Sequence, residues 1–204
     1  ENLKTVPSVY HRLEKLMDDI PKIQEYQYRL LKYYTEHYRI QKYEPCSGYV
    51  QFMFIDLCPQ SFYGLYDWWG IPKKGLQAML ESNAPVGVFA KHKDYLDSLY
   101  IVNDTHEDLG QCELTWIITE AFSGNLVEKG TVTAEIQADS CIKAKEFESG
   151  YGKEQKWNLT LILSDYDGKC IAKNTYQDIC TLLSRVDGHP ERMSHEFGMR
   201  LYWA

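Results

Sequence analysis

An aromatic and a carboxylate four positions apart, Phe52 and Asp56, are the residues best suited to chemistry in this chain. An aromatic ring packs against the C–H-rich face of a pyranose, and a carboxylate accepts hydrogen bonds from sugar hydroxyls. Further aromatic residues follow closely, at Phe62, Tyr63, Tyr66, Trp68 and Trp69. We therefore predict a carbohydrate pocket in which Phe52 and Asp56 bind the substrate. The same pattern also fits Phe52 as a core residue and Asp56 as a residue that caps a loop.

Hydrolysis of a glycosidic bond would need more than this pair. It usually requires two carboxyl groups, about 5–5.5 Å apart for retention and about 6.5–9.5 Å for inversion. Asp56 and Asp67 are the only acidic residues between Gly48 and Lys73, and several turn formers separate them. Nothing in this spacing places both in one cavity, so we predict no catalytic residue in the segment.

Other catalytic motifs are missing from the sequence. It has no glycine-rich phosphate loop and no serine nucleophile elbow, and His195-Glu196 lacks the second histidine of a zinc protease motif. The six histidines are scattered, and we interpret them as surface residues. We expect neither a metal nor a cofactor.

A strand and a loop must position the aromatic and the carboxylate. Residues 49–55 are mostly apolar on both faces, which predicts a fully buried strand. Asp56 then follows the C-terminal end of that strand, where barrel enzymes place their active sites. Proline and glycine residues mark the loop after it, before a helix near 73–82. Trp68 and Trp69 in this loop fit a packed hinge better than a sugar platform.

Two helices are predicted ahead of this segment. The first covers 8–19, with Ser8 as its N-cap. The second runs from Lys22 to about Lys42, with apolar residues at three- and four-residue steps. Its apolar row is interpreted as core packing, and its opposite face carries Lys22, Glu25, Arg29, Lys32, Glu36 and Arg39.

The pattern changes after Pro85, where period-two segments and turn signals replace the helical periodicity. The expected strands cover 86–91, 98–103, 112–120, 126–136, 141–147, 157–163 and 169–174. This number and spacing of short strands favours an immunoglobulin-like antiparallel β-sandwich. Alternation in the third strand places Trp116 on the inner face. Residues 177–204 are unassigned, with a possible final strand at 199–203.

Charge, apolar runs and cysteine content indicate which classes of binding partner and which compartment to expect. The net charge is −7, from 29 acidic against 22 basic residues. Without a Lys/Arg cluster we expect no nucleic acid partner, and no apolar run approaches the about 18–20 residues that span a bilayer, so we expect no membrane partner. Six scattered cysteines are interpreted as buried thiols, although their even number leaves disulfides open. We therefore expect a reducing compartment, the cytoplasm.

The segment from Gly48 to Lys73 resembles the last barrel strand and exit of the family-two glycoside hydrolases, which include β-galactosidases, β-glucuronidases and β-mannosidases. The residues that carry the likeness are Gly48, Phe52, Asp56, Pro59, Asp67, Gly70, Pro72 and Lys73. The strand-rich part is similar to the C-terminal immunoglobulin-like module of the family, at Leu99–Asp104, Thr115-Trp116, Ser123-Gly124, Asp167-Gly168 and Asn174–Tyr176. The β-mannosidase-like branch is the most similar.

The resemblance implies an α+β fragment. Residues 1–84 would hold the last helices and strand of a (β/α)8 TIM barrel, 85–176 an immunoglobulin-like β-sandwich, and 177–204 an unassigned tail. The parent protein would be a retaining glycoside hydrolase that cleaves β-glycosidic bonds, with the β-linked glycan as substrate. Its two catalytic glutamates would lie on earlier barrel strands, upstream of this chain. The isolated chain is then expected to be inactive, with the remainder of the parent polypeptide as its partner.

Two departures from the family pattern bear on these expectations. Phe52 stands where the family commonly has tryptophan, so its stacking on a sugar would be weaker. Ile55 stands where the family commonly has asparagine. Glu196, in Ser-His-Glu-Phe-Gly, resembles the sequence around the family nucleophile but follows the sandwich instead of preceding the barrel helices.

An alternative function is a non-catalytic carbohydrate-binding or protein-interaction sandwich. A partial barrel would also leave strand edges and helix faces uncovered, which predicts self-association.

Overall fold

The computed structural model describes residues 20–60, 63–92, 96–151 and 157–179. The elements in these ranges are α2 (Ile20–Arg39), α3 (Lys74–Ser82), β1 (Val86–His92), β2 (Leu96–Asn103), β3 (Gly110–Glu120), β4 (Leu126–Ile136), β5 (Ser140–Tyr151), β6 (Trp157–Ser164) and β7 (Cys170–Ile179). The helix predicted over 8–19, the possible strand at 199–203, and Glu196 lie outside the described residues. Neither described helix is long and apolar enough to cross a bilayer.

The described residues fall into two compact units. Unit 1 contains 20–32, 51–60 and 63–80, and unit 2 contains 33–50, 81–92, 96–151 and 157–179. Both helices begin in unit 1 and end in unit 2. The domain boundary expected between residues 84 and 85 stays a prediction.

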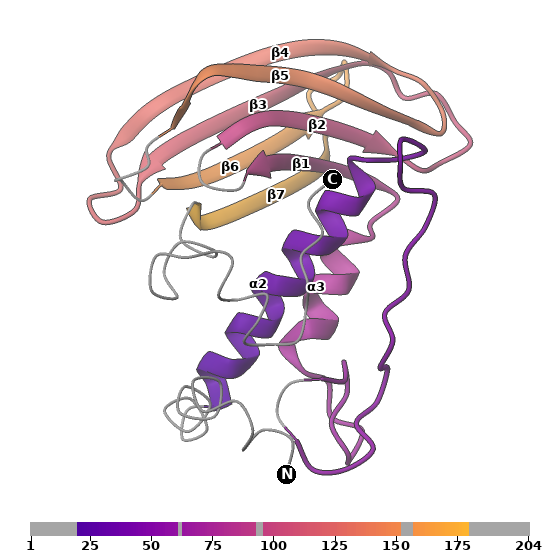
Figure 1. Ribbon diagram of the computed structural model, residues 1–204. Helices are drawn as coiled ribbons and strands as arrows, with labels where there is room; N and C mark the ends of the chain where they lie inside the picture. Colours follow the sequence, from indigo (N-terminus) through magenta and orange to yellow (C-terminus); the bar gives the residue numbers. More distant parts are fainter. Residues whose placement is uncertain (1–19, 61–62, 93–95, 152–156, 180–204) are drawn as a thin grey trace. The chain divides into compact units, whose positions relative to one another are not determined.

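Unit 2 consists mainly of two antiparallel sheets (Figure 1). The strand order is β1-β2-β5 in one sheet and β4-β3-β6-β7 in the other. Residues from both sheets form a single hydrophobic cluster, which includes Val88, Leu99, Ile101, Cys112, Leu114, Trp116, Ile118, Leu159, Leu161 and Leu163. Because a sheet face rich in apolar side chains must be covered, the two sheets pack against each other. The predicted antiparallel two-sheet architecture is confirmed.

Alternation explains why these segments form strands. In β6 every second residue is buried, and Leu159, Leu161 and Leu163 are at most 1% exposed. Trp116 on β3 is 7% exposed, as predicted for an inner-face residue. Gly130 is its partner on β4, and a Cβ there would lie 2.2 Å from the Trp116 ring. The strand thus has a glycine where the indole needs the space.

The charged face predicted for the long helix is buried at its C-terminal end. Glu36 is 3% exposed and Arg39 is 6% exposed, both within unit 2. Glu36 accepts hydrogen bonds from Tyr176 Oη at 2.7 Å and Asn174 Nδ2 at 2.9 Å. Arg39 donates to the Ser82 carbonyl at 2.6 Å. The sequence pattern missed this role because the partners lie on β7 and at the end of α3, far away in the chain.

The buried strand predicted over 49–55 is wrong. No residue from 48 to 54 is in a strand, and Ile55 makes only an isolated bridge with Tyr66. Val50 is 92% exposed, Phe52 91% and Phe54 64%. A strand is stable when neighbouring strands satisfy its backbone N–H and C=O groups, and the described residues of unit 1 contain no strand to pair with it. The barrel strand expected here is therefore not confirmed.

Cysteine burial differs from the expectation as well. Cys46, Cys58, Cys112, Cys141 and Cys170 are all free thiols. Cys112 is buried, but Cys58 and Cys170 are exposed, so the description as buried thiols is wrong for these two. The sixth, Cys180, lies outside the described residues.

Candidate functional site

Asp56 lies in unit 1 and is only 2% exposed. One carboxylate oxygen, Oδ2, pairs with the Lys73 ammonium, which is itself buried. The other, Oδ1, accepts hydrogen bonds from the Gly64 amide at 2.6 Å and from Gln60 Nε2 at 3.1 Å. Two carboxylate oxygens with three donors are well satisfied, which is the condition for burying a charged pair. In this arrangement Asp56 organises the loop around it.

Gly64 is the residue that lets the loop close on Asp56. A Cβ at this position would lie 2.5 Å from Asp56 Oδ1 and 2.7 Å from the Tyr66 carbonyl oxygen. The Gly64 carbonyl in turn accepts a hydrogen bond from Gln27 Nε2 on α2 at 2.9 Å. Backbone bonds complete the closure, since the amides of Leu65 and Tyr66 both donate to the Phe54 carbonyl at 3.0 Å. Any side chain at Gly64 would force these groups apart.

Asp67 stabilises a separate turn in the same segment. Its Oδ1 accepts hydrogen bonds from the amides of Trp69 at 2.9 Å and Ile71 at 2.8 Å. The turn includes Gly70, whose φ of 80° is one that glycine adopts readily. Asp67 therefore acts on its own backbone, whereas Asp56 pairs with Lys73. That the two aspartates form no catalytic pair stays a prediction.

The segment from Phe52 to Ile71 in unit 1 exposes many apolar side chains, which we call its exposed apolar surface. Phe52 is 91% exposed, and other large apolar residues of the same segment are also exposed, namely Phe54, Leu57, Tyr63, Trp68, Trp69 and Ile71. Among them Phe54 packs against Tyr66, with ring centroids 5.1 Å apart. Exposed apolar side chains are available for contact with a ligand or another protein surface. Phe52 is thus available for a contact, whereas the Asp56 carboxylate is buried.

Helix α3 fixes the C-terminal side of this surface. Lys74 donates to Glu25 of α2 at 2.8 Å, and Gly75 has no room for a Cβ beside Gln27. Burial raises the pKa of Glu25, but hydrogen bonds from Lys74 and Arg29 outweigh it, so the pKa lies below its usual value. The first turns of α3 therefore pack on α2 within unit 1, and Lys73 is positioned for its pair with Asp56.

Sequence reasoning missed the pair between Asp56 and Lys73. Both residues belong to the segment that resembles the glycosidase family, but seventeen positions separate them and no local pattern joins them. The sequence offers one signal for such a pair. An acidic residue stands in an apolar stretch, and a basic residue follows at the start of the next helix.

Within the described part of the chain, no group of three or more His, Cys, Asp or Glu side chains is placed to hold a metal.

Comparison with known proteins gives matches of fold and none of sequence. No family model matches the chain, and no curated protein sequence matches it. An exo-chitosanase from Amycolatopsis orientalis, solved in complex with PNP-β-D-glucosamine, covers 79% of this chain with a TM-score of 0.68 and 19% identity. A β-D-mannosidase from Dictyoglomus thermophilum covers 71% with a TM-score of 0.59 and 23% identity.

This chain spans a small part of those proteins, namely 19% of the exo-chitosanase and 18% of the β-D-mannosidase. At such identities the similarity concerns the fold, and function has to be argued from a site. The chain thus has the fold of a segment found within two enzymes whose names describe action on sugars.

Proposed function

We propose that this chain is part of a retaining family-two glycoside hydrolase of the β-mannosidase-like branch. In this proposal the parent protein cleaves β-glycosidic bonds, and the chain supplies one wall of the sugar pocket and a bracing immunoglobulin-like sandwich. The carrying observation is the similarity in fold to an exo-chitosanase and to a β-D-mannosidase. The order of residues from Gly48 to Lys73 supports it, because the same order is typical of that family near its pocket.

Phe52 is the proposed substrate-contacting residue. Its ring is 91% exposed, so it can stack on a pyranose without any rearrangement of its own side chain. Direct binding of substrate by Asp56, which the sequence predicted, requires its carboxylate to leave Lys73 and Gly64. We therefore propose Asp56 as a positioning residue that acts through the loop, and the catalytic glutamates as residues of the parent upstream of this chain.

The exposed apolar surface of the segment Phe52–Ile71 fits this proposal. Side chains such as Leu57, Trp69 and Ile71 are each more than half exposed. Burial of apolar area contributes about 25 cal/mol per Å², so covering these side chains contributes favourable free energy to the binding of a partner. The proposed partner is the remaining barrel of the parent polypeptide. Self-association of the isolated chain through the same surface is the expected consequence of its exposure, and sedimentation at several concentrations would detect it.

The test is hydrolysis of aryl β-mannoside, β-galactoside and β-glucuronide by the full-length parent and by the isolated chain. We expect the parent to cleave the mannoside best and the isolated chain to cleave none. Phe52→Ala in the parent should raise KM about three- to tenfold, and Phe52→Trp should lower it, because an aromatic contact is worth about 0.5–1.5 kcal/mol.

Leu57→Ala is the matched control, since Leu57 is 71% exposed in the same loop and has no assigned contact with the sugar. Its KM should equal that of the unmodified protein. A parent that cleaves none of the three substrates contradicts the proposed function. An equal rise in KM for Leu57→Ala and Phe52→Ala contradicts the specific role of Phe52.

A second candidate function is a non-catalytic carbohydrate-binding module. The exposure of Trp68 and Trp69, 50% and 69%, favours it, because exposed indoles are common sugar platforms. The isolated chain would then bind oligosaccharides with a change in tryptophan fluorescence. Loss of that signal in Trp69→Ala but not in Phe52→Ala would support the binding module over the pocket wall.

A further inference from the structure

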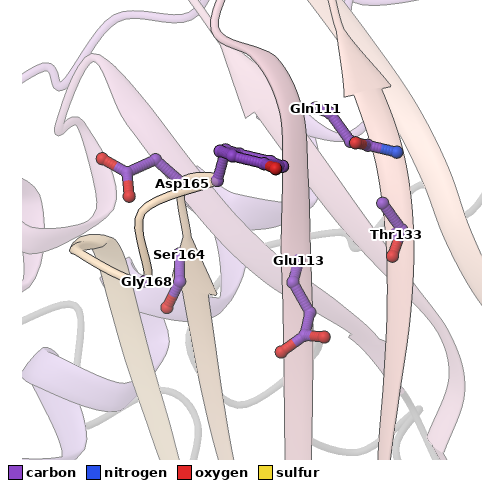
Figure 2. A pocket seen from close by; sticks show the side chains of 7 residues that line it. Gln111, Glu113, Thr133, Ser164, Asp165 and Gly168 are labelled. Carbon is purple, nitrogen blue, oxygen red and sulfur yellow. The ribbon is translucent and has the colours of Figure 1, made fainter.

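A polar hollow lies on the outer face of the four-stranded sheet in unit 2 (Figure 2). Its volume is about 420 Å³, and it is lined by Gln111, Glu113, Thr133, Ser164, Asp165, Tyr166 and Gly168. In the sheet, Glu113 is directly opposite Thr133 on one side and Ser164 on the other. Figure 2 shows Glu113 on the central strand between these two hydroxyl side chains, with Gln111 further along the same strand. The row crosses three strands and forms the floor of the hollow.

The sandwich core fixes this floor. On β3, Cys112 and Leu114 are buried in the hydrophobic cluster, so the alternate residues Gln111 and Glu113 must face outward. On β6 the burial of Leu163 has the same effect on Ser164. The floor is therefore held by strands whose alternate residues belong to the core of unit 2, so its own side chains face outward.

A tight turn between β6 and β7 forms the wall of the hollow. Asp165 Oδ1 accepts hydrogen bonds from the amides of Asp167 at 3.1 Å and Lys169 at 2.8 Å. The Gly168 amide donates to the Asp165 carbonyl at 3.0 Å, and Gly168 has a φ of 78°, which favours glycine. Tyr166 projects from this fixed turn with 86% of its surface exposed. A stable turn thus presents an uncovered aromatic ring beside the polar floor.

The chemistry of the lining selects a class of ligand. Hydroxyl, amide and carboxylate groups make up nearly all of it, so an apolar ligand would leave them without hydrogen bonds. None of the described residues that line the hollow is basic, and Glu113 and Asp165 both carry negative charge, so an anion is repelled. Two carboxylates alone are too few oxygen ligands for a dedicated calcium site. A polyhydroxylated ligand with an apolar ring face suits both the floor and Tyr166.

We infer that this hollow is a saccharide-binding subsite of the sandwich, with Tyr166 stacking on a sugar ring and Glu113 accepting hydrogen bonds from it. A neutral or amino sugar is accepted and a uronic acid is rejected, because of the two carboxylates. The inference goes beyond the proposed function, since it requires only unit 2 and no hydrolysis. It assigns the sandwich a direct contact with glycan in addition to its bracing role.

The experiment titrates the 204-residue chain with three trimers while backbone amide NMR signals are followed. The probes are the β-1,4-linked trimers of mannose, mannuronate and glucosamine. The first two differ in the group at C6, which isolates the effect of a carboxylate. We expect signals of residues 111–113 and 164–168 to shift with mannose and more strongly with glucosamine trimer, and to stay unchanged with mannuronate trimer.

Two variants with matched controls test the named contacts. Tyr166→Ala should weaken binding of both accepted trimers about tenfold, whereas Phe122→Ala, which removes an exposed aromatic ring elsewhere in unit 2, should not. Glu113→Gln should weaken the glucosamine trimer about tenfold and the mannose trimer less, because a hydrogen bond to a charged group is the stronger one. Glu107→Gln removes an exposed carboxylate elsewhere in unit 2 and should leave both affinities unchanged.

Some outcomes would overturn the inference. No change in any signal of the hollow, changes confined to residues 51–73, or equal binding of the mannuronate trimer would each contradict it. Failure here is distinguishable from failure of the proposed function. An inactive parent whose hollow binds glucosamine trimer refutes only the hydrolase, and an active parent whose hollow binds nothing refutes only the subsite.

Discussion

Strand β6 and the segment 50–55 have similar sequence patterns and different structures. Both alternate large apolar residues, yet Leu161 in β6 is fully buried and Phe52 is 91% exposed. Strand β6 pairs with β3 on one side and with β7 on the other, so its backbone groups are satisfied by neighbours. Among the described residues of the chain, the segment 50–55 pairs with no strand. Apolar alternation thus indicates a strand only where partners for its backbone are available.

The segment 51–73 is held together differently from the sandwich. The sandwich depends on ladders of backbone hydrogen bonds and a shared apolar core. The loop in unit 1 depends on one buried ion pair, between Asp56 and Lys73, and on bonds to Gly64. Replacement of one side chain can open a loop that a few polar contacts hold together. In the sandwich core, many apolar contacts share the stabilisation. The first two predictions below test this difference and the third concerns unit 2 alone, in order from the largest expected effect to the smallest.

Asp56→Ala should be the most damaging change in the loop. It leaves the Lys73 ammonium buried without its partner, which costs about 3–5 kcal/mol. Amide hydrogen exchange should speed up at Leu65 and Tyr66, whose amides bond to Phe54, while β6 stays protected. Asp67→Ala is the control, since it removes two hydrogen bonds near the surface at about 0.5–1.5 kcal/mol each. Equal exchange in both variants would mean that the ion pair does not hold the loop.

Leu161→Ala and Phe52→Ala compare the two apolar patterns directly. Leu161 is 0% exposed in the sandwich core, so its truncation should lower the free energy of unfolding by about 2–5 kcal/mol. Phe52→Ala should change it by no more than about 0.5 kcal/mol, because the ring is already in water. Urea denaturation of both variants measures the difference. A loss of stability in Phe52→Ala comparable to that in Leu161→Ala would show that the ring is packed in solution.

His37 should make unit 2 slightly less stable in mild acid. Burial, and then the nearby charge of Lys91, lower the pKa of His37 in the folded state. Below the unfolded pKa of about 6.5 the unfolded chain binds a proton that the folded chain does not, so stability falls as the pH falls toward the folded pKa. Unfolding in urea at pH 7, 6 and 5 should show a smaller decrease for His37→Gln than for the unmodified chain. An identical decrease in both would contradict the prediction.

Much of unit 2 could be predicted from local pattern. Strand β4 was expected at its observed bounds of 126–136, and Trp116 was expected on the inner face. Strands β5 and β7 extend beyond the predicted ranges, to Tyr151 and Ile179, because pairing with neighbours continues where the apolar pattern weakens. Alternation is a property of one strand, so it predicts well which face of the sheet each side chain occupies. It predicts poorly where the strand begins and ends.

The candidate site was less predictable because its contacts are distant in sequence. The segment 48–73 stands out by its composition, and Phe52 and Asp56 stand out in it by residue type alone. Neither the exposure of Phe52 nor the burial of Asp56 follows from type, since both depend on which groups lie nearby. The polar hollow has the same origin, because Glu113 and Ser164 meet only when β3 pairs with β6.

The sequence by itself determined the seven strands of the sandwich, the inward side chains and the two described helices, because each depends on periodicity over a few residues. Only the tertiary structure decided that Glu36 is buried, that Asp56 pairs with Lys73, and that residues 50–55 form no strand. The physical reason is that burial and pairing are properties of two segments together. A periodic pattern describes one segment, and its partners are chosen by the fold.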